Sequence, residues 1–127
     1  MQNDFLSLTG TVIEGRKIAR QLGYPTMNLE VPDNYNLNYG IYAGFMEYKN
    51  QKHPGAISFG ITPNFIEAKP KLEIHVFNFN EELYGEMIKI IPKYFIRNEM
   101  KFENIESLIK QIENDCKLAE KLLGSVS

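Results

Sequence analysis

Hydrophobic residues recur along most of the chain in short alternating runs bounded by turn-forming residues, a pattern typical of β-strands. These runs predict strands at residues 8–13, 40–48, 52–60, 71–79 and 85–91, together with a short strand that follows Gly23. A hairpin turn is predicted at Lys49–Gln51, between two of the longer runs. Pro92 lacks a backbone donor, so it is predicted to end the last strand or to lie at a sheet edge.

Both faces of the run at residues 71–79 carry bulky apolar side chains, which predicts a strand that is covered on both sides. Glu73 and His75 share one of these faces. A carboxylate in such a strand must be solvated, paired or chemically employed. From the pattern alone, Glu73 is therefore either an ordinary strand glutamate or a functional one, and His75 is interpreted as structural.

After residue 104 the hydrophobic period changes to that of a helix. Asn104 is a good N-cap, and Glu106 in the first turn suits the helix dipole. One apolar helical face is predicted from Ile105, Leu108, Ile109, Ile112, Cys116, Ala119 and Leu123. The solvated face is predicted to hold the charged residues Glu113, Asp115, Lys117, Glu120 and Lys121.

About six strands and one C-terminal helix, without alternation of strands and helices, favour a mainly β fold. We expect a six-stranded antiparallel barrel with Greek-key connections, which the C-terminal helix closes at one end. The chain has 127 residues, so residues 1–127 are expected to form a single domain.

Composition narrows the function classes. Apolar residues make up 43% and charged residues 24%, which is ordinary for a globular protein. The net charge of −2 gives no support to a nucleic-acid or membrane-surface binder. A single cysteine, Cys116, excludes an internal disulfide and a cysteine-based metal cage. With no signal peptide expected at Met1, these features predict a cytoplasmic protein.

The stretch from Arg20 to Leu29 combines a glycine, a proline and two small oxygen-bearing side chains beside a basic loop. Because side chains two apart share a strand face, Thr26 and Asn28 are expected to point together, and Met27 towards the core. A hydroxyl and an amide carbonyl so placed could hold a hard cation that carries phosphates. The alternative is a turn and an edge strand whose polar side chains only satisfy backbone groups.

This stretch also carries a family resemblance. Leu-Gly-Tyr-Pro-Thr-Met-Asn-Leu, at residues 22–29, resembles the Leu-Gly-aromatic-Pro-Thr-Ala-Asn-Leu motif of the ATP-dependent riboflavin kinases. Five later stretches match the same family in order, at Gly40–Ala43, Ser58–Pro63, Leu72–His75, Leu83–Gly85 and Ile96–Phe102. The resemblance extends over nearly the whole chain and implies a barrel fold.

The resemblance implies transfer of the ATP γ-phosphoryl group to the ribityl 5′-hydroxyl of riboflavin, giving FMN and ADP. Glu73 would be the base for that hydroxyl. Thr26 and Asn28 would contact Mg²⁺ and the nucleotide phosphates, with Gly15 and Arg20 as further nucleotide-binding residues. ATP and riboflavin would be substrates, and Mg²⁺ the cofactor.

On the flavin side, the resemblance implies Tyr84, Arg97 and Phe102 as binding residues. An aromatic ring can pack on the isoalloxazine, and an arginine can bind its polar edge or the phosphate. The basic loop departs from the family at Lys17 and Ala19, where glycines are usual, which leaves nucleotide affinity open.

Two other functions remain open. A barrel that keeps the flavin pocket could act as a non-catalytic riboflavin or FMN sensor or carrier, although such a module has no need of a base at Glu73. A structural interaction domain would need none of the site motifs. The family's kinase domain often follows an FAD-synthesising adenylyltransferase domain, which has no counterpart in these residues. We therefore expect either a separate kinase or part of a longer bifunctional chain.

Overall fold

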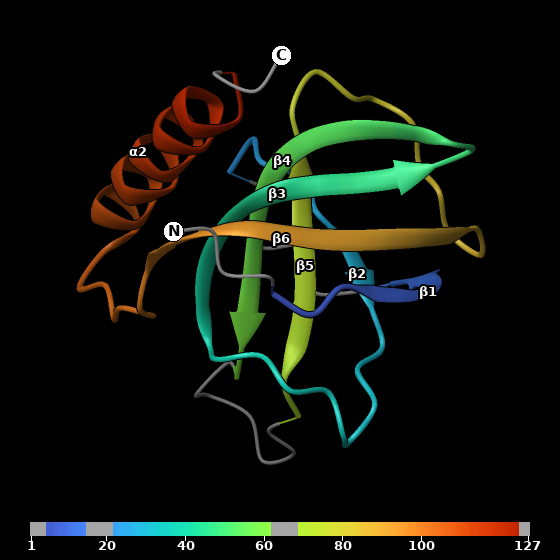
Figure 1. Cartoon of the computed structure of the whole chain (residues 1–127). Coiled ribbons are helices and arrows are strands. Elements are labelled where there is room, and N and C mark those ends of the chain that lie inside the picture. Colours follow the sequence, from blue (N-terminus) through green and yellow to red (C-terminus); the bar gives the residue numbers. More distant parts are fainter. Residues whose placement is uncertain (1–4, 15–21, 62–68, 125–127) are drawn as a thin grey trace.

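The computed structural model describes residues 5–14, 22–61 and 69–124. Its elements are β1 (Leu8–Ile13), β2 (Met27–Leu29), β3 (Gly40–Tyr48), β4 (Gln51–Gly60), β5 (Lys71–Val76), β6 (Met87–Arg97) and α2 (Ile105–Gly124). The strands close into a barrel in the order β1-β2-β5-β4-β3-β6, and every pair is antiparallel. The predicted mainly β barrel with a C-terminal helix is confirmed (Figure 1).

The connections have the predicted Greek-key form. β3, β4 and β5 are consecutive neighbours, and β6 returns to pair with β3. Lys49 and Asn50 join β3 to β4 with φ values of 49° and 63°. Two successive positive φ values are those of a type I′ turn, whose twist matches that of the flanking strands.

The barrel interior is formed by one face of each strand. Tyr42, Ile57 and Ile74 have no exposed surface, and they belong to the main core cluster of the barrel. Because successive side chains alternate, Glu73 and His75 on β5 point to the outer face of the wall. The outward residues of β5 are half-buried, and Phe77 just beyond the strand packs in a second, outer cluster, so the coverage of β5 on both sides stays a prediction.

The sequence pattern predicts that Pro92 ends the last strand or lies at a sheet edge, and the structure shows that it does not end the strand. β6 continues from Met87 to Arg97, and Pro92 is fully buried within it, opposite Gly44 of β3. The register shifts between Ala43 and Gly44, so the proline lies beside an irregularity where the ladder is already interrupted. β1 pairs with β6 only up to Ile90, so no β1 carbonyl needs a donor from Pro92.

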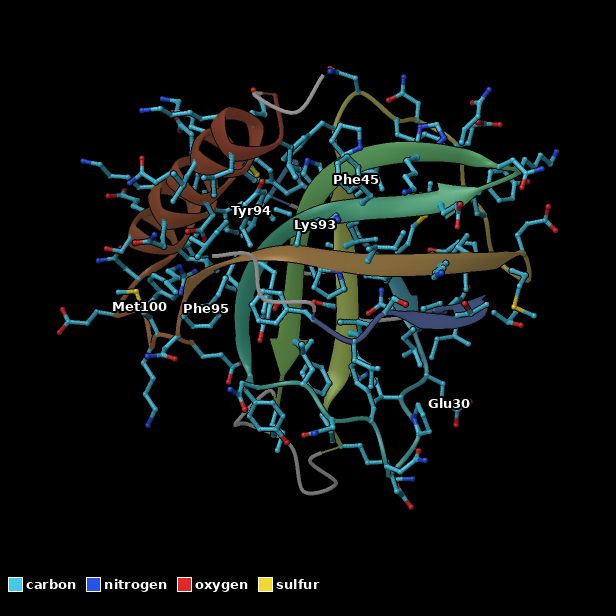
Figure 2. The ribbon with its side chains drawn as sticks, in the orientation of Figure 1. Glu30, Phe45, Lys93, Tyr94, Phe95 and Met100 are labelled. Atoms are coloured by element: carbon cyan, nitrogen blue, oxygen red, sulfur yellow. The ribbon has the colours of Figure 1, made fainter. Side chains whose placement is uncertain are left out.

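The helix covers the outer face of the barrel wall and not one of its ends, which corrects the sequence prediction. Ala119 and Leu123 of α2 pack on Ala43 of β3, together with Phe45 and Tyr94. Tyr94 lies between the helix and the strands in Figure 2. The apolar face of the helix begins later than predicted, because Ile105 is 63% exposed.

The predicted N-cap is confirmed, since Asn104 Oδ1 accepts a hydrogen bond from the Ser107 backbone N–H at 2.8 Å. No helix in the described ranges is both long and apolar enough to cross a membrane.

Candidate active site

A cavity of about 320 Å³ lies between the outer face of the barrel wall and α2. β4 and β5 form its floor, the segment from Leu22 to Thr26 forms one side, and the link from β6 to α2 forms another. Its lining includes Tyr24, Thr26, Ser58, Lys71, Glu73, His75, Arg97, Glu99, Phe102, Leu108, Ile112, Asp115 and Cys116. Four of the residues predicted from the sequence therefore meet here, namely Thr26, Glu73, Arg97 and Phe102.

Glu73 lies in the middle of the cavity floor. It is half-buried on β5 and pairs across the sheet with Asn28 of β2 on one side and Ser58 of β4 on the other. Directly opposed residues of an antiparallel pair share a face, so the three side chains point the same way. The carboxylate thus has an amide and a hydroxyl as its immediate cross-strand neighbours.

Asn28 is 4% exposed, and its Oδ1 accepts no hydrogen bond from any described residue. A buried carbonyl oxygen without a donor costs about 1–3 kcal/mol. The predicted orientation of the segment is supported, because Met27 pairs with Ile74 and packs on the barrel core, while Asn28 pairs with Glu73. The orphaned oxygen is the kind of ligand that a hard cation takes.

The donor set fits an Mg²⁺ ion that is bound with a nucleotide. Among residues 5–14, 22–61 and 69–124, no three His, Cys, Asp or Glu side chains gather closely enough to hold a metal ion. A protein-only carboxylate cage is therefore absent from this part of the chain. Mg²⁺ prefers oxygen ligands, keeps several waters and often takes the rest of its shell from substrate phosphates. Asn28 Oδ1 and the Thr26 hydroxyl suit that arrangement.

The segment that carries Thr26 is anchored by a side chain. β2 pairs only from Met27 onward, and Pro25 before it has no N–H to offer a ladder. Instead, His75 Nδ1 lies 2.7 Å from the Pro25 carbonyl oxygen. The imidazole also packs edge-on to the Tyr24 ring, with 5.4 Å between the two ring centres. A carbonyl oxygen can only accept, so Nδ1 carries the proton. The structural interpretation of His75 is supported.

Arg97 joins β6 to α2 through Asp115. Its Nε donates to Asp115 Oδ1 and Oδ2 at 2.9 and 3.1 Å, and its Nη2 donates to Oδ2 at 2.8 Å. The guanidinium also lies 5.9 Å from the centre of the Phe102 ring. Asp115 is 5% exposed, so its predicted place on the solvated helix face is wrong. The helical spacing of Leu108, Ile112, Asp115 and Ala119 puts it within the apolar stripe, which is the signal that could have found it.

Glu99 is a second cavity residue that the sequence did not single out as functional. Its carboxylate occupies the space beside Gly60, where any larger side chain would collide with it. Burial raises the pKa of the Glu99 carboxyl, and the nearby Arg97 charge partly offsets that effect. Burial also raises the pKa of the Cys116 thiol, to about 11, so this cysteine is an uncharged part of the wall at neutral pH.

Four predicted residues are not placed in this cavity. Asn28 does not line it, because it is buried in the barrel wall next to Glu73. Tyr84 lies in the turn before β6, is 40% exposed and does not line the cavity. Gly15 and Arg20 fall outside the described residues, as do the departures from the family at Lys17 and Ala19.

Comparison with known proteins decides the family. The family model described as "Flavokinase: Riboflavin kinase" matches residues 3–123. This chain belongs to the riboflavin kinase family.

Relatives of known name agree with this assignment. The bifunctional riboflavin kinase/FMN adenylyltransferase of Buchnera aphidicola subsp. Schizaphis graminum is 41% identical over 123 residues, which cover 94% of this chain and 39% of that protein. The RNA-binding riboflavin kinase RibR of Bacillus subtilis is 35% identical over 115 residues, which cover 90% of this chain and 50% of that protein. The chain thus spans half or less of the length of these two relatives.

A solved structure supports the fold. The crystal structure of riboflavin kinase from Trypanosoma brucei matches with a TM-score of 0.64 at 22% identity, over 93% of this chain and 79% of that one. The family assignment supports a riboflavin kinase enzyme over a non-catalytic flavin-binding module of the same fold.

Proposed function

We propose that this chain transfers the γ-phosphoryl group of ATP to the ribityl 5′-hydroxyl of riboflavin, giving FMN and ADP. The observation that carries the proposal is the position of Glu73 on the cavity floor, between Asn28 and Ser58. A half-buried carboxylate that faces a cavity can accept the proton of a bound hydroxyl. In the reaction, the hydroxyl oxygen bonds to the γ-phosphorus, the bond from that phosphorus to the ADP oxygen breaks, and the proton passes to Glu73.

The nucleotide end of the site is assigned to Thr26 and Asn28. The orphaned Oδ1 of Asn28 and the Thr26 hydroxyl would ligate Mg²⁺, which neutralises phosphate charge when it is bound with ATP. His75 holds the Pro25 carbonyl and so fixes the approach of Thr26 to the cavity. Gly15 and Arg20 remain predicted contributors to nucleotide binding.

The flavin is assigned to the part of the cavity beneath α2. Leu108, Ile112 and Phe102 give this part an apolar surface that suits the faces of an isoalloxazine ring. Arg97 lies at the same end and provides hydrogen-bond donors for polar atoms of the ring. Tyr84 stays a prediction, because it lies away from this cavity.

The wider context is also proposed. The net charge of −2 supports small-molecule substrates in preference to nucleic acid, although one relative is named as RNA-binding. Relatives named as bifunctional support a kinase unit that acts within a longer chain, and the cytoplasm stays the predicted location.

The test is an assay that resolves FMN from riboflavin after incubation with ATP and Mg²⁺. We expect FMN from the wild-type protein and a loss of about 10²–10⁴-fold in kcat for Glu73→Gln. Glu30→Gln is the matched control, because Glu30 is an exposed glutamate of the loop after β2, on the far side of the barrel from α2 in Figure 2, and should keep full activity. A folded wild-type protein that binds riboflavin but forms no FMN would refute the kinase and favour the flavin-binding module.

A further inference from the structure

Resting on the proposed function, we infer that Asp115 is a positioning residue for riboflavin: it orients the Arg97 guanidinium so that two of its N–H groups are held ready for neighbouring acceptors of the flavin. Asp115 does not itself need to touch substrate. Its role is to fix the plane of a cation that lines the same cavity.

The first support is the cost of placing Asp115 where it is. The carboxylate is 5% exposed on a helix whose other face offers ample solvent. It accepts from Nε and Nη2 of Arg97 and from Gln111 Nε2, the last at 3.0 Å. Pinning a helix to a strand needs no such group, because a well-packed apolar pair often stabilises a protein as much as a buried ion pair or more. What an apolar pair cannot do is fix a guanidinium.

The second support is an inventory of the Arg97 donors. A guanidinium has five N–H groups. Nε–H and one Nη2–H are taken by Asp115, and one Nη1–H donates to the Asn98 carbonyl at 2.9 Å. One hydrogen on each Nη nitrogen therefore has no acceptor among the described residues. Since these two nitrogens are adjacent, their remaining hydrogens suit a ligand with neighbouring acceptor atoms, such as the carbonyl and ring-nitrogen edge of an isoalloxazine.

The third support is how little the guanidinium can move. Its side chain is only 18% exposed, and the two-bond contact with Asp115 sets both its distance and its plane. Phe102 covers it from the side of the link between β6 and α2. Donors that are already desolvated and oriented lose little freedom when a ligand binds, which is the general route by which preorganisation raises affinity.

The experiment compares Asp115→Asn with Glu113→Gln, which removes an exposed carboxylate of the same helix that pairs with Lys117. Asparagine keeps the shape of Asp115 but turns an NH₂ group towards an arginine N–H, so the guanidinium must swing away. Riboflavin affinity is measured by fluorescence titration without ATP, KM for riboflavin and for ATP by FMN formation, and stability by thermal unfolding.

We expect Asp115→Asn to raise the riboflavin Kd and KM by about tenfold or more, the scale of one lost hydrogen bond to a charged donor. The KM for ATP and kcat should stay within about twofold of wild type, because Thr26, Asn28 and Glu73 are untouched, and Glu113→Gln should change nothing. Arg97→Lys keeps the charge but loses the planar fork, so it should weaken riboflavin binding similarly. Adding Asp115→Asn to Arg97→Lys should then cost little more.

If Asp115→Asn lowers the unfolding temperature but leaves riboflavin Kd unchanged, Asp115 only secures the helix and the inference is overturned. Should this variant not fold, Asp115→Glu provides the test, because it keeps the pair but shifts the guanidinium by one methylene. Wild-type riboflavin affinity in a folded Asp115→Glu protein would also overturn the inference. Binding and turnover are measured separately, so a wild-type protein that binds riboflavin without making FMN refutes only the kinase, whereas one that binds no riboflavin refutes both.

Discussion

The orphaned oxygen of Asn28 gives a prediction in which stability and function move in opposite directions. Replacing Asn28 by Leu, which has the same branching at Cγ, removes a buried acceptor that no described residue satisfies. Relief of that acceptor is worth about 1–3 kcal/mol, and loss of the amide donor costs about 1 kcal/mol. We therefore expect the nucleotide-free variant to gain about 1 kcal/mol in free energy of unfolding, or about 3–5 °C in Tm.

When Mg²⁺ and ADP are added, the wild-type protein should become more stable than Asn28→Leu. A ligand at 100 times its Kd stabilises the folded protein by about 2.7 kcal/mol, and Asn28→Leu should lose this gain together with FMN formation. Urea denaturation of both proteins, with and without MgADP, measures this reversal in their free energies of unfolding. Asn80→Leu, at an exposed loop position, is the control and should change neither quantity appreciably. A nucleotide-free Asn28→Leu protein that is less stable than wild type by 1 kcal/mol or more would refute the reasoning.

Three further predictions concern the cavity and the barrel wall. Glu99→Gln should raise the Tm at pH 7, because burial raises the pKa of Glu99 above its ordinary 4.5 and ionisation of the carboxyl therefore costs stability at higher pH. This gain in Tm should fade as the pH drops towards 4.5. A gain in Tm that grows in acid would contradict the prediction. The Cys116 thiol, with a pKa of about 11, should resist iodoacetamide at pH 7.5 in the folded protein and react once urea unfolds it; equal rates in both states would show that it is accessible. Gly44→Ala should lower the free energy of unfolding, measured by urea denaturation, by about 3 kcal/mol, because its Cβ would lie 2.1 Å from the Ile91 carbonyl oxygen. In the control Gly10→Ala, the new Cβ would meet only side-chain atoms at 3.7 Å or more, so this change should be tolerated.

The alternation of hydrophobic residues was enough to predict the barrel, because each strand places one face inside. It failed where tertiary contacts overrode a local rule. The usual exclusion of proline from a strand interior did not hold at Pro92, since β1 ends before it and the β3 register shifts beside it. The strand predicted at residues 71–79 ends at Val76, because Asn78 adopts a left-handed φ of 55°.

The candidate site was predictable where a short motif spans a strand. Thr26, Asn28 and Glu73 follow from alternation and family resemblance, and the pairing of Asn28 with Glu73 supports their common face. The sequence analysis placed Asp115 on the solvated face of the helix because it is charged. Its helical spacing puts it among apolar residues, and it is buried in the structure. Its partner Arg97 lies 18 residues away on another element, so only the docking of α2 on β6 brings them together.

The positions of the cavity-lining residues along the sequence have a consequence for folding during synthesis. Lining residues extend from Leu22 to Cys116, and the last of them lie on α2, which packs against strands that are already neighbours in the barrel. A nascent chain can therefore bury its barrel interior before it has any complete pocket for a flavin, because Arg97 meets Asp115 only after the helix has emerged. Chains that stop early are then expected to fold in part without withdrawing riboflavin or ATP from the cell, and ligand binding becomes a property of the finished domain alone.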